Sequence, residues 1–387
     1  MKQYILSFFL AIAFSFSADA EEFSIGVQMP LSGSMARAGN GFLEGVQTAT
    51  EIFNRGNGQH KIKLITIDDE SSPAKGVAAV EKLAAEGVAA IIGGYGSNVI
   101  GPASDAANKL KLVYITAGGV SEDLTRRGFK TFFRINNTAG YEKALLTLFA
   151  ELGIKSVSIV YSTKDSTAAL ARDVGQSLTD RNVKTFLHPF DPAISDFKPV
   201  INKIRLQDKP EAILMCGYEN DYVGIIRAAK VLKPEIKTLV GIWSLATPRM
   251  AKDFPDLMPN VIGTSMLPYP VEYDSKEGRQ FADTYKKLFN KEVDYLPQFG
   301  YVMAQLLFEA VARAADSGAL KKDASDAIAT ELRKTNRLTL IGRVSFDANG
   351  DNPNFAQRMG QHQNGKVVIV SPKRDATGSI VYPGVPW

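Results

Sequence analysis

The chain has 387 residues, and its 45 basic side chains against 41 acidic ones give a net charge of +4. No run of Lys or Arg stands out, which argues against binding to nucleic acid or to a membrane surface. Chains beyond about 250–300 residues tend to split into domains, because one hydrophobic core stops growing at that size. Two domains are therefore expected.

The N-terminal segment is typical of an export signal. Lys2 supplies the charged start, residues 5–16 form a short apolar run, and residues 18–20 (Ala-Asp-Ala) provide a small-residue cleavage site. The apolar run is too short for a bilayer span, which takes about 20 residues. Residues 1–20 are therefore predicted to be a signal peptide that is cleaved after Ala20.

The single cysteine, Cys216, lies in an apolar run and is predicted to be a buried thiol without an internal disulfide partner. A lipid-anchored exported protein needs a cysteine directly after its cleavage site, and Glu21 stands there instead. We therefore expect free diffusion in a Gram-negative periplasm.

The first part of the chain alternates β-rich runs with segments of helical period. The β-rich runs are residues 24–28, 62–67, 88–92 and 112–116. In the first helical segment Phe42, Val46, Ala49 and Phe53 share one face. This βαβα order predicts a parallel sheet covered on both sides.

The pattern restarts after the linker-like residues 134–138. Further β-rich runs are residues 157–160, 183–187, 212–215, 238–241 and 261–265, and three later helical segments are residues 276–290, 298–316 and 325–334. A second α/β lobe follows, with the later helices covering an existing sheet. The polar C-terminal part is strand-like, and Asn349-Gly350 is predicted to be its hairpin turn.

Several motifs occur in a fixed order along the chain. They are residues 25–27 (IGV), 30–33 (PLSG), 68–69 (DD), 91–94 (IIGG), Ser97 with 101–104 (GPAS), and 124–129 (LTRRGF) followed by 133–134 (FR). On these residues the chain resembles the periplasmic binding proteins of the leucine/isoleucine/valine type, over essentially the whole mature chain. The resemblance implies an α/β fold of two Rossmann-like lobes with parallel sheets, the type I arrangement, joined by three crossover strands.

The same resemblance implies the substrate-binding component of an ATP-driven importer, whose partners are an inner-membrane permease and its ATPase. It implies a monomer without a cofactor. It also places the crossings near Asn137, Pro268 and Ile341, whereas periodicity alone gives one boundary near 137. Lobe 1 is then residues 21–137 with 268–340, and lobe 2 is residues 138–267 with 341–387.

Two glycine-containing loops of lobe 1 are candidate anion sites, because ligands of open α/β sheets bind outside the carboxyl ends of the strands. One loop leads to Ser97, whose hydroxyl can donate to a carboxylate. The other contains Gly118, Gly119 and Val120; the resemblance implies backbone N–H donors here, with Val120 replacing a threonine of the family. The alternative is that Ser97 only caps the next helix.

In lobe 2 the resemblance places Trp243 where amino-acid binders carry the acid that holds the substrate ammonium. An unpaired buried charge costs several kcal/mol. An α-amino acid would therefore need another acid, such as Glu219 or Asp165. The favoured ligand is instead a carboxylate with a hydrophobic body, either aromatic or aliphatic.

The remaining candidates concern the size and walls of the pocket. Ala38 and Ser166 align with bulky aromatics of the branched-chain binders and enlarge the pocket, while Tyr218 aligns with an aromatic. Tyr95 and Phe299 add rings suited to a flat apolar ligand. The alternative is that Tyr95, Phe299 and Trp243 are packing residues.

Catalysis is not expected. The loop at Gly94-Tyr95-Gly96 lacks the third glycine of a dinucleotide fold and the Lys of a phosphate loop. His60, His188 and His362 show neither metal-ligand spacing nor a triad arrangement. Residues 68–70 (DDE) are predicted to be a solvated loop before a helix. A ligand-sensing receptor subunit remains as a second class of function, to be separated from a transport component by whether a permease is encoded alongside.

Overall fold

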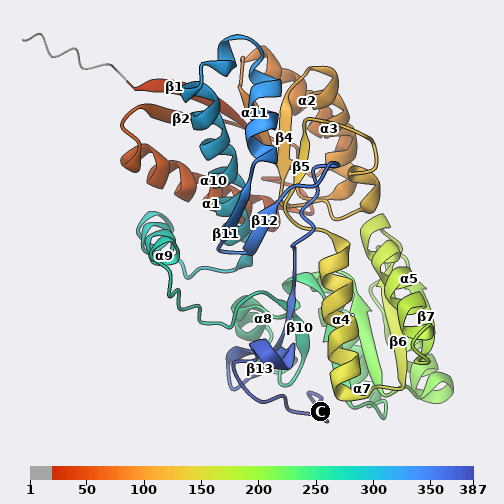
Figure 1. The fold of residues 1–387 in the computed structure, drawn as a ribbon. Helices are drawn as coiled ribbons and strands as arrows, with labels where there is room; N and C mark the ends of the chain where they lie inside the picture. The colour runs from red at the N-terminus through yellow and green to blue at the C-terminus, as the bar shows by residue number, and fades with distance from the viewer. Residues whose placement is uncertain (1–19) are drawn as a thin grey trace, which may run out of the picture.

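The computed structural model describes residues 20–387, so the expected export signal lies outside the described residues except for Ala20. Two α/β lobes lie one above the other, and segments of the chain cross between them (Figure 1). No helix in the described part is both long and apolar enough to cross a membrane.

Lobe 1 is built on a parallel sheet with the strand order β2-β1-β3-β4-β5. Its strands are β1 (Glu21–Met29), β2 (His60–Asp68), β3 (Ala90–Gly93), β4 (Val113–Thr116) and β5 (Phe132–Arg134). Its helices are α1 (Ala36–Gly56), α2 (Pro73–Ala85), α3 (Ser97–Lys109), α9 (Lys276–Phe289), α10 (Tyr295–Asp316) and α11 (Ala324–Arg333). Helices α2 and α3 pack together, as do α1 and α10, and the short central strands β3 and β4 are fully buried.

Lobe 2 carries a larger sheet with the order β14-β13-β10-β9-β8-β6-β7. Its strands are β6 (Ser156–Ser162), β7 (Lys184–Phe190), β8 (Ala212–Cys216), β9 (Thr238–Gly241), β10 (Ile262–Ser265), β13 (Arg358–Gln363) and β14 (Lys366–Ser371). Its helices are α4 (Thr138–Leu152), α5 (Asp165–Thr179), α6 (Lys198–Lys203), α7 (Glu219–Leu232) and α8 (Pro248–Asp253). Strands β6 to β10 are parallel and repeat the strand order of lobe 1, with the first strand between the second and the third.

Most predicted elements are confirmed, since every β-rich run of the sequence lies in or overlaps a strand, and Cys216 is fully buried in β8. The sheet of lobe 2 is mixed, because β13 and β14 join it antiparallel. The prediction of a hairpin turn at Asn349-Gly350 is wrong. The turn that joins β13 to β14 is Asn364-Gly365, and both of its residues have positive φ. Asn349-Gly350 instead lies in a loop in which the Gly350 N–H donates to the Asp347 carbonyl.

The third crossing lies further along the chain than expected near Ile341. Strands β11 (Asn336–Thr339) and β12 (Gly342–Ser345) form a small hairpin, after which the chain stays against lobe 1. The Phe346 ring packs on Phe133 with centroids 5.0 Å apart, and the Asp351 carboxylate pairs with Arg134 of β5. These contacts hold residues 342–352 on lobe 1, so the chain crosses between Asp351 and β13.

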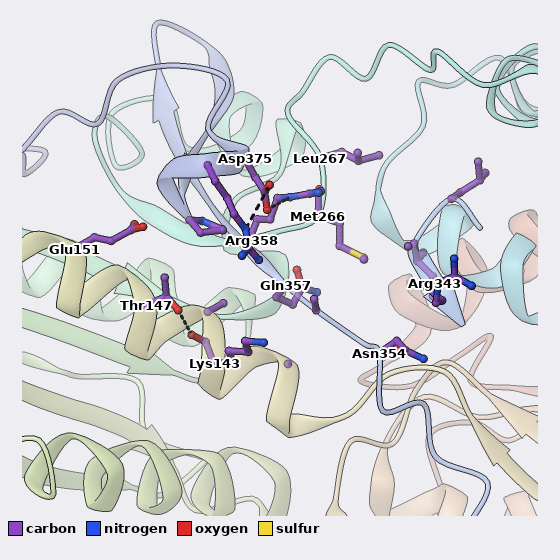
Figure 2. Close-up of a pocket in the computed structure, with 18 residues that line it drawn as sticks. Lys143, Thr147, Glu151, Met266, Leu267, Arg343, Asn354, Gln357, Arg358 and Asp375 are labelled. Carbon is purple, nitrogen blue, oxygen red and sulfur yellow. Dashed lines mark hydrogen bonds and ion pairs between the residues drawn. The ribbon is translucent and has the colours of Figure 1, made fainter. Parts of the chain in front are cut away.

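Two cavities without a shared lining residue lie near the crossings. One is lined by loops at the carboxyl ends of the strands in both lobes. The other, of about 510 Å³, lies beside α4, between the segment that follows β10 and the segment that leads to β13 (Figure 2). We call the first the ligand cavity and the second the hinge pocket.

Candidate functional site

The ligand cavity lies where the strand order of each sheet reverses, which is the usual binding edge of open α/β sheets. Loops after β3 and β4 approach it from lobe 1, and loops after β6, β8 and β9 approach it from lobe 2. Its volume is about 40 Å³. This is room for only a water or two, so a ring-sized ligand must part the walls.

Nine of the ten candidate residues line this cavity. They are Tyr95, Ser97, Gly118, Gly119, Val120, Ser166, Tyr218, Trp243 and Phe299. Ala38 does not; it lines an adjoining chamber of about 280 Å³ that shares Tyr95 and Tyr218 with the cavity. Ala38 thus lies in the chamber next to the cavity, and its effect on the size of the binding site stays a prediction.

Six further residues line the cavity. Gly96 and Ala117 belong to the two glycine loops that the sequence indicates, whereas four residues were not predicted: Phe42, Asn136, Tyr141 and Tyr295. Phe42 was recognised only as part of an apolar helix face, and Asn136 only as part of a linker. Tyr141 follows that linker in the first turns of α4. An aromatic residue just after a crossing is the signal that was available.

Aromatic rings from both lobes form the walls. The Trp243 ring lies 5.2 Å from the Tyr218 ring and 6.4 Å from the Tyr141 ring, centroid to centroid, all three in lobe 2. In lobe 1 the Phe42 ring lies 5.5 Å from the Tyr95 ring and 6.5 Å from the Phe299 ring. Such offset and edge-on ring sets favour a flat apolar ligand. Phe299 is both a packing residue and part of the cavity wall, because its side chain is only 2% exposed and lines the cavity.

Trp243 has a positive φ of 52°, and no other aromatic residue of the described chain is in this conformation. A bulky side chain there is strained, at a cost of about 1–3 kcal/mol. The strain sets the indole just beyond the end of β9, against the Tyr218 ring. Strain of this kind is typical of residues that are held in place for binding.

The glycine loop after β4 offers fewer free donors than expected. The Gly118 N–H donates to Thr116 Oγ1 at 3.0 Å, and the Gly119 N–H donates to the Tyr95 carbonyl at 2.8 Å. Both backbone donors that the sequence suggested are thus engaged within lobe 1. The Val120 N–H has no hydrogen-bond partner among the described residues, so it is the free donor of this loop.

Ser97 is the first residue of α3, and the N-cap is Gly96, so the alternative that Ser97 caps this helix is wrong. Ser97 Oγ accepts from the Ser121 N–H at 3.3 Å, which leaves its own O–H free to donate. The start of a helix also presents unpaired N–H groups and a positive dipole end. Ser97 and Val120 therefore form a neutral site for an anionic oxygen.

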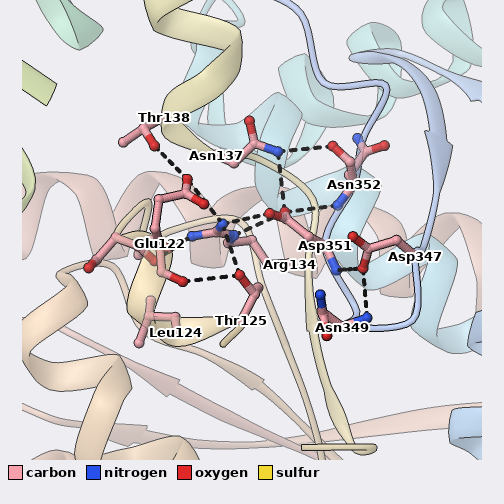
Figure 3. Close-up of polar contacts among 12 residues, drawn as sticks. Glu122, Leu124, Thr125, Arg134, Asn137, Thr138, Asp347, Asn349, Asp351 and Asn352 are labelled. Atoms are coloured by element: carbon pink, nitrogen blue, oxygen red, sulfur yellow. Dashed lines mark hydrogen bonds and ion pairs between the residues drawn. The ribbon is translucent and has the colours of Figure 1, made fainter. Parts of the chain in front are cut away.

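A buried arginine holds this loop in place (Figure 3). Arg134 Nη1 donates to the Ser121 carbonyl at 2.7 Å and to the Gly119 carbonyl at 3.2 Å, the two carbonyls that flank Val120. Its Nη2 pairs with an Asp351 oxygen at 2.6 Å. Arg134 thereby ties the anion loop to the third crossing.

Asn136 contributes an acceptor to the cavity. Its Nδ2 donates to the Ala117 carbonyl at 2.6 Å, and this bond assigns the orientation of the amide. The Oδ1 is buried without a hydrogen-bond partner among the described residues. A buried acceptor without a partner costs about 1–3 kcal/mol, so a ligand hydroxyl or N–H at this position would be favoured.

No acidic or basic residue is among the described residues that line the ligand cavity. Burial raises the pKa of Tyr218 to about 12, so its hydroxyl stays protonated as a neutral donor. The two acids considered as ammonium partners lie elsewhere. Glu219 pairs with Arg37 of lobe 1 at 3.1 Å and with Arg249 at 3.7 Å, and Asp165 is exposed in the first turn of α5.

The acidic residues after β2 are only partly solvated. Asp68 accepts from the Leu31 and Ser32 N–H groups, whereas Asp69 is fully buried and bonded to Gln28. The solvated-loop expectation is therefore wrong for Asp69, which braces β1. Among residues 20–387 no group of three or more His, Cys, Asp or Glu side chains is arranged to hold a metal ion.

Two lobes around a cleft lined by strand-end loops define the class of two-lobed solute-binding proteins. The sequence model of the periplasmic binding protein family matches residues 22–366. The chain belongs to this family.

Individual relatives are distant but cover most of the chain. A Leu/Ile/Val-binding protein of Escherichia coli is 23% identical over 357 residues, which are 89% of this chain and 92% of the relative. The substrate-binding protein LivJ of Streptococcus pneumoniae, solved with isoleucine, has a TM-score of 0.78 at 22% identity over 94% of this chain and all of the other. A solute-binding protein of R. palustris, solved with benzoate, has a TM-score of 0.78 at 17% identity over 94% of this chain and 97% of the other.

Proposed function

We propose that this protein is the periplasmic substrate-binding component of an ATP-driven importer, exported by a signal peptide cleaved after Ala20. It captures a small carboxylate with a hydrophobic, preferably aromatic, body between its lobes. The observation that carries the proposal is the make-up of the ligand cavity: aromatic walls with a neutral anion site, and no charged side chain among the described lining residues. Binding requires no cofactor, and no catalytic step follows.

The carboxylate is held at one end of the cavity. Its oxygens accept from the Ser97 hydroxyl and the Val120 N–H, at the positive end of α3. The ligand body lies between Tyr95 of lobe 1 and Trp243 of lobe 2, and Asn136 accepts from a hydroxyl on that body where one is present. Two of the relatives above were solved with an isoleucine and a benzoate ligand, which share the carboxylate and differ in the ammonium.

The absence of a charged side chain among the described residues that line the ligand cavity argues for an amine-free acid. An ammonium buried without an anionic partner costs several kcal/mol, and the neutral Asn136 oxygen repays only part of this. Glu219 is already neutralised by Arg37 and Arg249. No specific observation favours the alternative role of a sensor subunit.

Closure of the two lobes completes the site. The cavity is too narrow to admit a ring unless the walls part, so the ligand enters an open form and the ring wall of lobe 2 closes on it. The ligand favours the closed form because only that form offers both walls. The closed protein then delivers the ligand to the permease.

A thermal-shift screen of residues 21–387 tests the proposal, with benzoate and its hydroxylated derivatives in one panel and leucine-like and aromatic amino acids in the other. A ligand at a hundredfold excess over Kd stabilises the native state by about 2.7 kcal/mol. We expect stabilisation by the amine-free acids, strongest for one whose hydroxyl reaches Asn136. Stabilisation by amino acids alone would refute the ligand class, and scattering without compaction on binding would refute closure.

Ser97→Ala is expected to weaken benzoate binding about tenfold or more, because a hydrogen bond to a charged group contributes about 1.5–3 kcal/mol. Isothermal titration measures the change in Kd. Ser121→Ala is the matched control, since it keeps the backbone N–H that bonds Ser97 Oγ. Equal losses in the two variants would contradict a direct contact from Ser97.

Glu219→Gln separates two roles of this residue. If the Arg37–Glu219 pair joins the closed lobes, the loss of this partly exposed pair weakens the binding of every ligand by a similar factor of about two to five. If Glu219 instead holds a substrate ammonium, amino acids lose binding and amine-free acids do not. We expect the first result in titrations of both ligand types, with Glu235→Gln, an exposed charge elsewhere on lobe 2, as control.

A further inference from the structure

The hinge pocket has a volume of about 510 Å³ and lies near the crossings, and both lobes contribute to it. Arg343 belongs to the β11–β12 hairpin beside lobe 1, and Lys143 lies on the outer face of α4 in lobe 2 (Figure 2). Met266 and Arg358 approach it from the segments that cross between the lobes. Any change in the angle between the lobes therefore changes its shape.

Positive charge dominates this pocket. Four cations line it, Lys143, Arg343, Arg358 and Arg374, against two acids, Glu151 and Asp375. The acids are already engaged. Glu151 accepts from Ser371 Oγ at 2.6 Å and from the Lys373 N–H at 2.8 Å, and Asp375 pairs with both Arg358 and Arg374.

Two of the cations are free of acidic partners. The Lys143 ammonium has neither a hydrogen bond nor an ion pair within the described residues, and Arg343 Nη1 donates only to the neutral Asn336 amide. Lys143 and Arg343 stand on different lobes. A ligand with two acidic groups matches this pair of cations, one at each end.

Apolar side chains also line the hinge pocket. They are Ala144, Leu267, Leu340 and Ile341. An inorganic ion would leave these side chains without contacts, whereas the methylene chain of an organic acid would cover them. The pocket therefore fits a small organic dianion rather than phosphate or sulfate.

One side chain links the two cavities. Gln357 lines the hinge pocket, and its amide interacts with the Tyr141 hydroxyl. Burial raises the pKa of Tyr141, and the interaction with Gln357 lowers it by a smaller amount. Gln357 Oε1 is buried without a hydrogen-bond partner among the described residues. The Tyr141 ring lines the ligand cavity and contacts Trp243. A ligand that reorients Gln357 thereby shifts the wall of the ligand cavity.

We propose that the hinge pocket binds a small organic dianion, bridged between Lys143 of lobe 2 and Arg343 of lobe 1, and that its occupancy changes the affinity of the ligand cavity. The bridging anion favours one separation of these cations, and hence one angle between the lobes. The coupling is reciprocal, since each ligand changes the affinity for the other by the same factor.

The test uses the mature chain with glutarate, adipate and pimelate as probes. We expect at least one to bind with a Kd below about 1 mM, and Lys143→Gln/Arg343→Gln to weaken that binding at least tenfold. Lys109→Gln/Arg172→Gln removes the same charge from exposed positions elsewhere and should leave it unchanged. Absence of binding by all three acids, or binding that the first variant leaves intact, would overturn the proposal.

Coupling is measured by titrating benzoate with and without the saturating dicarboxylate. The expected change in benzoate Kd is about fivefold or more, and it should vanish in Lys143→Gln/Arg343→Gln. Small-angle scattering reads the lobe angle directly, so the dicarboxylate should change the radius of gyration even without benzoate. Failure of benzoate to bind, with dicarboxylate binding intact, counts against the proposed ligand class and not against the hinge pocket.

Discussion

Trp243→Ala is expected to weaken benzoate binding about thirtyfold or more, because a large ring at the centre of a binding site contributes about 2 kcal/mol or more. The indole faces the Tyr218 and Tyr141 rings and lines the ligand cavity. Thermal stability should change little by comparison, because the indole is only partly buried and its backbone is strained. Isothermal titration and thermal unfolding of the same samples separate the two effects.

Trp243→Phe is the control for the ring itself. It keeps an aromatic wall and the same strained backbone, and we expect it to retain most of the affinity. A loss of stability in Trp243→Ala with unchanged affinity would show that Trp243 is a packing residue of lobe 2. That outcome would restore the packing alternative and remove the main support for an aromatic ligand.

Much of the fold was predictable because its strands are short apolar runs separated by helical segments of clear period. A parallel sheet that is buried on both faces requires such runs. The same order places Ser97 and Trp243 at strand ends, where ligands of these sheets bind. Nine of the ten candidate binding residues, which were chosen from strand-end loops or from the resemblance, lie at the ligand cavity.

The errors arise where long-range contacts decide. The Gly118 and Gly119 N–H groups looked free, but Thr116 and Tyr95 accept from them once the loops pack together. Both Asn-Gly pairs fit a tight turn locally, and only the pairing of β13 with β14 selects Asn364-Gly365. Local turn chemistry does not contain that choice.

The position of the third crossing was predicted too early in the chain for the same reason. Arg134 and Asp351 are 217 positions apart, and their pairing holds the chain on lobe 1 beyond Ile341. A lone arginine in a short strand and an aspartate in a polar turn give no periodic signal. Their partnership follows from the burial of Arg134, which must find acids and carbonyls to offset its desolvation.

Asp351→Asn is expected to lower the free energy of unfolding by about 3–5 kcal/mol, because it leaves the fully buried Arg134 without its closest anion. Glu122, at 3.6 Å from Arg134, offsets only part of the loss. Urea denaturation measures the change. Glu292→Gln is the control variant, which removes one partner of the exposed Lys286–Glu292 ion pair. It should lower the free energy of unfolding by less than about 1 kcal/mol.

Removing both partners separates the structural role of the pair from its role at the anion loop. Arg134→Met/Asp351→Leu leaves no buried charge, so we expect it to regain part of the stability that Asp351→Asn loses. Affinity for benzoate should stay at least tenfold reduced, because the Gly119 and Ser121 carbonyls lose the donor that fixes Val120 between them. If affinity instead returned together with stability, Arg134 would hold lobe 1 together without positioning the carboxylate site.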